Sequence, residues 1–285
     1  MIDKVGVIGL GLIGGSMAKA ITEHTKHPVY AYNRTQQVVT NAINDGSIKG
    51  ELTKETAGLI DLLIIALYPK DVNSVLEGFI PYLKKGTIIV DCTGVKTSVC
   101  NDLSKSLKDK GFRFVGGHPM AGKEVAGYSN AEGSLYDNAS MILCRDEYTD
   151  EEAFMDAKKF FGEVGFLRVT ESTPKEHDRV IAFTSQMAHV VSNAYVKSPT
   201  LDKRYGFSAG SFKDLTRVAK LNEYMWTDLF LANKDPLLEE IDIFIENMKE
   251  FRKALGDEDK DKLIELLGEG RRLKEEDEEK DRCQK

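Results

Sequence analysis

The glycine-rich turn near the start of the chain constrains the fold more than any other feature. It follows the apolar run VGVI, precedes a helical pattern and reads Gly9-Leu10-Gly11-Leu12-Ile13-Gly14, a GxGxxG sequence. We expect Gly9 to permit a tight turn, Gly11 to admit a pyrophosphate, and Gly14 to let helix and strand pack closely. The turn therefore predicts a dinucleotide site with cofactor contacts at Gly9, Gly11, Leu12, Ile13 and Gly14. A strand–helix turn that binds no ligand is the alternative.

The end of the second apolar run carries the residues expected to contact the cofactor ribose. The chain reads Tyr32-Asn33-Arg34-Thr35 at this point. A carboxylate is usual here in NAD sites, whereas Asn33 leaves room for a 2′-phosphate and Arg34 supplies a charge for it. We predict a nicotinamide cofactor, NADP or NAD, contacted by Asn33, Arg34 and Thr35. A solvated turn arginine is the alternative for Arg34.

Apolar β-branched runs alternate with helical stretches over the first 170 residues. The expected strands read KVGVIG, PVYAYN, LLIIAL, TIIVDC, FRFVGG, SMILCR and GFLRVT. Such runs are typical of strands covered on both faces and predict a mostly parallel, doubly wound sheet. No convincing strand follows Thr173. We therefore predict an α/β Rossmann-type N-terminal domain over residues 1–171 and an all-α C-terminal domain over residues 172–285.

Helix-start signals divide the second part of the chain. Thr173-Pro174-Lys175-Glu176 has the form of a capping box and predicts a helix through about Val196. Ser211-Phe212-Lys213-Asp214 resembles a second capping box and predicts a helix through Trp226. Pro236 is expected to open a further helix, and the charged tail from Gly256 a last amphipathic helix with a frayed end.

Composition limits the classes of partner. The net charge of −7 argues against nucleic acid or an anionic membrane surface as a partner. The four cysteines form no C-x-x-C pair and match no zinc spacing, so we expect a reduced protein without a metal site. Because the apolar start lacks a basic leader and is broken by glycines, we expect neither a signal peptide nor a membrane span. These features predict a cytoplasmic protein.

Ligands of open α/β sheets bind at the carboxyl ends of strands, and His118 follows such a strand. A histidine can accept a hydroxyl proton near neutral pH, so His118 is a candidate general base; a structural loop histidine is an equal alternative. Asp178, Ser185 and His189 share one face of the helix after Thr173, which is either a ligand face or a polar helix–helix seam. His177, beside the cap, is expected to be structural.

Four segments together resemble the prephenate/arogenate dehydrogenase family: GLGLIGGSMAKAI, GGHPMAGKEVAG, TPKEHDRVIAFTSQMAH and AGSFKDLTRVA. The resemblance implies a helical C-terminal domain that forms a homodimer. It also implies oxidative decarboxylation of prephenate to 4-hydroxyphenylpyruvate, or of arogenate to tyrosine, in tyrosine biosynthesis. It further implies that His118 contacts the ring hydroxyl, His189 lies near the substrate and Arg217 binds a substrate carboxylate.

The chain departs from the family pattern at two places. Gly94 occupies the position of a usual serine, so we expect neighbouring Thr93 to supply the catalytic hydroxyl. The family's S-H-L-P-H segment reads Ser185-Gln186-Met187-Ala188-His189, which keeps Ser185 as a substrate-binding candidate. Lys123 and Glu124 are the candidates that would distinguish the side-chain ketone of prephenate from the amine of arogenate. That choice stays open at the level of sequence.

Two other interpretations of the sequence compete with a prephenate/arogenate dehydrogenase. A 3-hydroxyacid dehydrogenase or an imine reductase would share the two-domain plan, but those enzymes use a lysine base or lack a histidine at the strand end. A cofactor-sensing protein without catalytic activity would retain the glycine turn, and only turnover distinguishes it from a dehydrogenase.

Overall fold

The structure is a computed structural model that describes residues 2–123 and 125–283. The chain divides into two compact units, Met1–Lys234 and Asp235–Lys285. The predicted domain division after residue 171 stays a prediction, because the compact units divide about 60 residues later, where the helices that follow the sheet have already packed against it.

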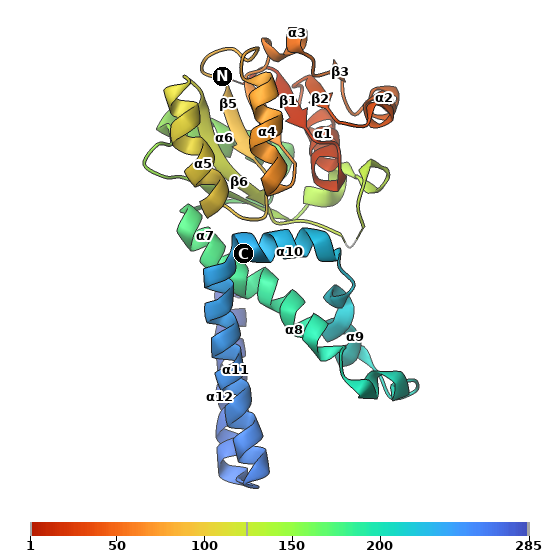
Figure 1. The fold of residues 1–285 in the computed structure, drawn as a ribbon, viewed down its shortest axis with the longest axis vertical. Helices are drawn as coiled ribbons and strands as arrows, with labels where there is room; N and C mark the ends of the chain where they lie inside the picture. The colour runs from red at the N-terminus through yellow and green to blue at the C-terminus, as the bar shows by residue number, and fades with distance from the viewer. Residues whose placement is uncertain (1, 124, 284–285) are drawn as a thin grey trace. The chain divides into compact units, whose positions relative to one another are not determined.

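A single sheet organises the first unit (Figure 1). Its order is β3-β2-β1-β4-β5-β6-β7-β8, and every neighbouring pair is parallel except β6 and β7. The strands are β1 (Val5–Ile8), β2 (Val29–Tyr32), β3 (Gly50–Glu51), β4 (Leu62–Ile65), β5 (Ile88–Asp91), β6 (Arg113–Pro119), β7 (Ser140–Cys144) and β8 (Arg168–Ser172). The predicted mostly parallel sheet is confirmed, and all seven predicted runs form strands.

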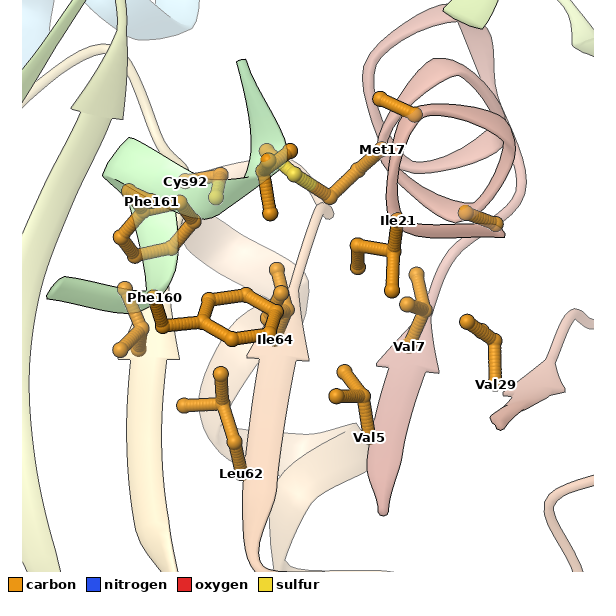
Figure 2. Packing of buried hydrophobic residues seen from close by; sticks show 14 of the residues in the cluster. Val5, Val7, Met17, Ile21, Val29, Leu62, Ile64, Cys92, Phe160 and Phe161 are labelled. Carbon is orange, nitrogen blue, oxygen red and sulfur yellow. The ribbon is translucent and has the colours of Figure 1, made fainter. Parts of the chain in front are cut away.

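Helices cover both faces of the sheet because alternate residues of its central strands point in opposite directions. Val5, Val7, Leu62 and Ile64 join one core cluster (Figure 2). The same cluster contains Met17 and Ile21 of α1 (Leu12–His24) and Phe160 and Phe161 of α6 (Glu151–Val164). The alternate positions Ile8, Leu63 and Ile65 join a second cluster on the opposite face, with side chains of α4 (Pro69–Phe79) and α5 (Thr97–Asp109). Polar side chains lie at the carboxyl ends of the strands, between these two layers of helices.

The helices of the sheet layer are α1 (Leu12–His24), α2 (Gln36–Asn44), α3 (Lys54–Ala57), α4 (Pro69–Phe79), α5 (Thr97–Asp109) and α6 (Glu151–Val164). After β8 the chain is helical, with α7 (Pro174–Ile181), α8 (Met187–Tyr195), α9 (Gly210–Thr216) and α10 (Glu223–Ala232). α7 continues into α8 through one π-helical turn, Ala182–Gln186. The long helix predicted after Thr173 is confirmed, and the Thr173 side chain accepts the Glu176 amide proton at its start.

The helix predicted from the second capping box is wrong in its cap and its length. α9 begins after Ala209 without a side-chain cap, and it ends at Thr216 in a short 3₁₀ turn, Arg217–Ala219. Lys220 then leaves the helical region, and Asn222 starts α10 by accepting the Met225 amide proton. A stronger N-cap inside the predicted span therefore divides it into two helices.

The second unit is a helical hairpin of α11 (Lys234–Gly256) and α12 (Lys260–Cys283). α11 begins two residues before the predicted Pro236. Lys262 Nζ lies 3.5 Å from Glu250 Oε2 and links the two helices near their turn. Within the described residues, none of the helices has both the length and the apolarity to span a membrane.

Candidate functional site

The turn between β1 and α1 has the geometry expected of a dinucleotide loop. Gly9 has a φ of +94°, and a Cβ there would lie 2.4 Å from the Ala66 carbonyl oxygen. A Cβ at Gly14 would lie 1.8 Å from the Gly9 carbonyl oxygen, so strand and helix require glycine at this contact. Gly11, by contrast, faces open space with nothing within 4 Å of an added Cβ. The turn therefore leaves its free surface where a pyrophosphate would meet the first amides of α1.

The end of β2 contacts this turn directly. Asn33 Oδ1 accepts the Leu10 amide proton at 3.0 Å, and Asn33 Nδ2 donates to the Thr35 carbonyl oxygen at 3.3 Å. Arg34 and Thr35 are exposed at the start of α2. Asn33 thus helps to shape the glycine turn, and the roles of Asn33, Arg34 and Thr35 toward a ribose remain predictions.

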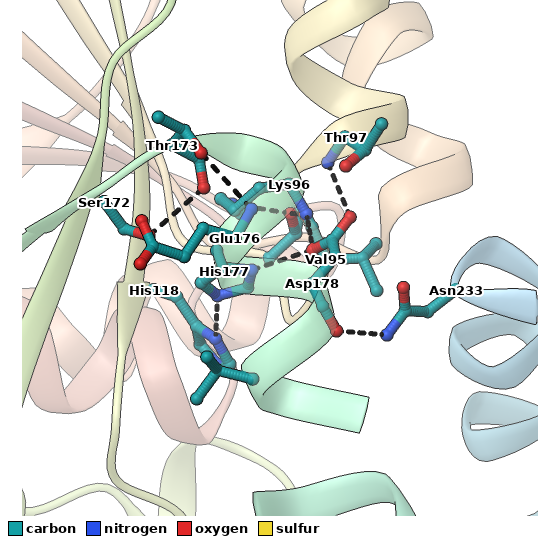
Figure 3. Close-up of polar contacts among 12 residues, drawn as sticks. Val95, Lys96, Thr97, His118, Ser172, Thr173, Glu176, His177, Asp178 and Asn233 are labelled. Atoms are coloured by element: carbon teal, nitrogen blue, oxygen red, sulfur yellow. Dashed lines mark hydrogen bonds and ion pairs between the residues drawn. The ribbon is translucent and has the colours of Figure 1, made fainter. Parts of the chain in front are cut away.

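His118, at the end of β6, is the first member of a row of hydrogen-bonded polar side chains (Figure 3). Its Nδ1 atom lies 2.8 Å from His177 Nε2, and His177 Nδ1 lies 2.8 Å from Asp178 Oδ1. His177 and Asp178 belong to the first turns of α7 and are buried. The fold therefore connects the candidate base to a carboxylate through a second imidazole.

The Asp178 carboxylate is held at the amino end of α5. Its Oδ1 accepts the Lys96 amide proton at 2.7 Å, and its Oδ2 accepts the Thr97 amide proton at 2.8 Å. Burial alone would raise the pKa of this carboxyl, but the hydrogen bonds from His177, Thr97 and Lys96 outweigh it and leave the pKa lowered. Asp178 is therefore an anion that accepts hydrogen bonds at both oxygens.

Both imidazoles favour the neutral form. Burial lowers the pKa of His118 well below 6.5, and the His177 ring and the Lys96 ammonium add to this effect, while Asp178 opposes it. Burial also lowers the pKa of His177 against the opposing hydrogen bond to Asp178. A neutral His118 has a lone pair and can act as a general base at neutral pH.

Lys96 is a fully buried cation near His118. Its Nζ pairs with the Asp91 carboxylate and donates to the Gly117 carbonyl oxygen at 2.5 Å. Gly117 directly precedes His118, so this contact anchors the end of β6. No sequence pattern singles out Lys96, because an isolated lysine predicts an exposed side chain.

The prediction that Thr93 supplies a catalytic hydroxyl does not fit the structure. Thr93 is buried, its Oγ1 lies 2.5 Å from Asp91 Oδ2 and 2.8 Å from the Val95 carbonyl oxygen, and it accepts from Lys96 Nζ at 3.0 Å. The hydroxyl is thus used by the buried network around Asp91 and Lys96. Its role is to support the strand ends.

Gly94 lies beside the base. A Cβ at Gly94 would be 4.0 Å from His118 Nε2 and 3.3 Å from Leu229 Cδ2 of α10. The Nε2 edge of the imidazole therefore faces the loop after β5, and α10 contributes an apolar side chain next to it. Glycine here supplies no hydroxyl to His118.

The helical segments bring together a second group of predicted residues. His189 Nδ1 lies 3.1 Å from the Val218 carbonyl oxygen. Its ring packs against that of Trp226 at a tilt of 37°, with centroids 3.6 Å apart. Arg217, which precedes Val218, is exposed, and Ser185 is half-buried in the π-helical turn. His189 and the turn that carries Arg217 are therefore neighbours, while their roles toward a substrate remain predictions.

The loop after β6 carries the remaining candidates. Lys123 Nζ lies 2.6 Å from Glu132 Oε2, so its ammonium has a carboxylate partner at the surface. Glu124 lies outside the described residues. A substrate contact at Lys123 stays a prediction and would compete with Glu132.

His177 is the main residue of the site whose place could not be predicted from the sequence. Its position beside a helix cap predicted a structural role, but the fold places its ring in contact with His118. The adjacent His-Asp pair, one turn after the Thr173 cap, was the available signal. Only the packing of α7 against the ends of β5 and β6 gives that pair a partner.

Comparisons with known proteins agree with this architecture. Residues 17–169 match the family model described as "Prephenate dehydrogenase, nucleotide-binding domain", and residues 173–269 match "Prephenate dehydrogenase, dimerization domain". The cyclohexadienyl dehydrogenase of Zymomonas mobilis is 31% identical over 281 residues, which cover 95% of this chain and 94% of that protein. The prephenate dehydrogenase of Bacillus subtilis is 30% identical over 93% of this chain and 73% of its own length.

A solved structure of prephenate dehydrogenase from A. aeolicus, in complex with hydroxyphenyl propionate and NAD+, superposes with a TM-score of 0.86. It is 27% identical, and the match covers 97% of this chain and 98% of that one. The family predicted from the four sequence segments is thereby confirmed. The chain belongs to the prephenate dehydrogenase family and is an NAD(P)-dependent oxidoreductase.

Proposed function

We propose that this enzyme oxidises and decarboxylates prephenate to 4-hydroxyphenylpyruvate, with arogenate as the alternative substrate. The observation that carries the proposal is His118, a neutral imidazole at a strand end, whose Nε2 edge faces the loop after the neighbouring strand. Relatives that span nearly all of this chain are cyclohexadienyl and prephenate dehydrogenases.

The reaction requires a base, an oriented substrate and a hydride acceptor. A nicotinamide cofactor held at the glycine turn would supply the hydride acceptor. His118 Nε2 accepts the proton of the ring hydroxyl while a hydride leaves the ring carbon that carries this hydroxyl. The carboxylate opposite then departs as carbon dioxide, and its bonding electrons complete the aromatic ring. Protonated His118 returns its proton to the oxygen that becomes the phenol, so the base is regenerated.

The substrate carries two carboxylates, and the helical segments supply partners for them. Arg217 has the planar guanidinium suited to two-point carboxylate binding. Because the Val218 carbonyl oxygen can only accept, His189 carries a proton on Nδ1. We assign His189 to the substrate contact that the family resemblance implies. Ser185 and Lys123 are secondary candidates for substrate contacts. Thr93 has no place in this assignment.

The assembly and location follow the same proposal. Residues 173–269 match a dimerization domain, which supports a homodimer formed through the helical part of the chain. The substrate in this proposal is a small molecule, as in the enzymes that the chain resembles. The absence of a nucleic acid or membrane partner and a cytoplasmic location remain our expectations from composition.

Reduced-cofactor absorbance tests the proposal directly. Prephenate and arogenate are each combined with NAD+ and NADP+, and the four values of kcat/KM are compared. We expect turnover with at least one pair and release of carbon dioxide in equal amount to reduced cofactor. Cofactor binding without turnover of either substrate would favour a cofactor-sensing protein instead.

A further inference from the structure

We propose that His177 and Asp178 form a positioning pair that fixes the tautomer of His118, so that the Nε2 lone pair of the base faces the substrate. This proposal rests on the role of His118 in the proposed function. It adds two residues that do not contact the substrate but determine which nitrogen of the base carries a proton.

The direction of the hydrogen bonds follows from Asp178. Its carboxylate accepts the amide protons of Lys96 and Thr97 at 2.7 and 2.8 Å, which an ionised carboxylate does best. An ionised Asp178 can only accept, so the proton between it and His177 belongs to His177 Nδ1. The carboxylate thereby sets the tautomer of the first ring.

The tautomer of the second ring, His118, follows from that of His177. A neutral His177 with its proton on Nδ1 presents Nε2 as an acceptor. The atom 2.8 Å from it, His118 Nδ1, must therefore donate, which places the proton of neutral His118 on Nδ1. The remaining nitrogen, Nε2, has a lone pair, and it is the nitrogen that faces Gly94. The opposite tautomer would present an N–H at that edge and could not accept a proton.

Burial keeps both rings neutral in the resting enzyme, and the charge of Lys96 adds to this effect. The charged groups that act on His118 and His177 are Lys96, Asp178 and Asp91. Lys96 is paired with Asp91 and is fully buried beneath the strand ends. Its charge opposes a second cation nearby, whereas Asp178 stabilises the imidazolium that forms when His118 accepts its proton.

Two substitutions at His177 separate positioning from packing. In His177→Gln, the side-chain amide oxygen can still accept from His118 Nδ1. In His177→Phe, an aromatic ring fills the same space but offers no acceptor, so neutral His118 populates both tautomers. We expect His177→Phe to lower kcat on the order of 10- to 100-fold, with the KM for cofactor unchanged. His177→Gln should recover most of this loss.

Nitrogen NMR of the ring-labelled enzyme gives a readout that does not depend on activity. In the parent at neutral pH, we expect His118 to show a protonated Nδ1 and an unprotonated Nε2, and in His177→Phe two nitrogens with averaged shifts. A parent with Nε2 protonated would overturn the proposal, as would equal kcat values for the Gln and Phe variants. If the parent has the expected tautomer but turns over neither substrate, the proposed function fails while the positioning pair stands.

Discussion

The affinity of His118 for protons is set by its neighbours more than by its own chemistry. Burial, the His177 ring and the Lys96 cation all lower its pKa, and only Asp178 opposes them. A base with a lowered pKa is unprotonated in the resting enzyme at neutral pH. It is also a weaker base, so the reaction depends on Asp178 and on the substrate's position to drive the proton transfer.

Replacing the base tests its role most directly. We expect His118→Asn to bind cofactor with unchanged affinity but to lose about 100- to 10,000-fold in kcat, the usual effect of removing a general base. Cofactor titration and steady-state turnover of the same preparation measure the two effects. His24→Asn, at an exposed histidine of α1, serves as the matched control and should retain parent activity. Near-parent turnover of His118→Asn would exclude His118 as the base.

The same histidines should make stability depend on pH. The folded pKa values of His118 and His177 lie below the ordinary 6.5, so in this range the unfolded chain binds protons more readily. Their contribution is fully present above about pH 6.5 and is lost as pH falls through the folded values, by at most about 1.4 kcal/mol per pH unit for each ring.

Urea unfolding of the parent and of His177→Gln at several pH values between about 7.5 and 5.5 measures this dependence. The free energy of unfolding should fall less steeply with decreasing pH in the variant, which has lost one of the two buried rings. Identical slopes for the two proteins would show that His177 does not titrate differently in the folded and unfolded states.

At the scale of elements, two glycines of the β1–α1 turn are expected to serve different purposes, one in packing and one in cofactor binding. Gly14 cannot carry a side chain, because an added Cβ would overlap the Gly9 carbonyl oxygen at 1.8 Å. Gly11 has open space around its Cα. Two glycines of one motif therefore have different reasons to be glycine.

Alanine substitutions distinguish these reasons. Gly11→Ala should leave the thermal midpoint unchanged and raise the KM for cofactor, because the methyl group occupies the approach of the pyrophosphate. Gly14→Ala should lower the thermal midpoint by several degrees, which corresponds to an unfolding free energy reduced by roughly 1–3 kcal/mol. If Gly11→Ala bound cofactor as the parent does, the pyrophosphate would have to lie away from this turn.

We expect the end of β2 to set the preference between NAD and NADP. Asn33 already accepts the Leu10 amide proton, so its oxygen is committed to the turn. The next residue, the exposed Arg34, offers a cation for a 2′-phosphate. We expect the parent to accept NADP at least as well as NAD, and Arg34→Ala to weaken NADP by roughly 1.5–3 kcal/mol, the loss of a charge-assisted pair.

Asn33→Asp should keep the Leu10 contact, add a negative charge and shift the preference toward NAD. The ratio of kcat/KM for the two cofactors in the parent and both variants decides the matter. A parent that strongly prefers NAD, or an Arg34→Ala variant with an unchanged ratio, would place Arg34 in solvent.

Sequence patterns predicted elements well where one physical signal dominates. Continuous apolar runs gave seven strands, and the Thr173 cap gave the start of α7. β3 was missed because two residues, Gly50–Glu51, carry no periodicity. The division between α9 and α10 was missed because the cap at Asn222 competes with a weaker signal at Ser211. Local signals of similar strength need the tertiary structure to decide between them.

The site shows a different limit. His118 could be predicted because a strand end is a local feature with a known functional meaning. The contact between His118 and His177 joins residues 59 positions apart, and the Asp178 contacts with the Lys96 and Thr97 amides join residues more than 80 apart. Such contacts depend on how α7 crosses the sheet edge, which no local pattern contains.

At the scale of the whole molecule, the second unit exposes a row of apolar side chains along α11. On α11, the positions Leu238, Ile241, Ile245, Met248 and Leu255 recur at alternating spacings of three and four, with Arg252 completing the series. All of these apolar residues except the half-buried Ile241 are exposed. A stripe of this kind is typical of helices that pack against a partner helix.

We expect this stripe to contribute to the homodimer interface, because it lies within the segment that matches a dimerization domain. Met248→Glu places a charge near the centre of the stripe, where its burial without a partner would oppose association. The variant should sediment as a monomer at micromolar concentrations at which the parent is a dimer. Lys249→Gln changes the net charge by the same amount at the neighbouring exposed position and should leave the dimer intact. A Met248→Glu protein that stays dimeric would place the interface on another surface, and a monomeric parent would contradict the proposed assembly.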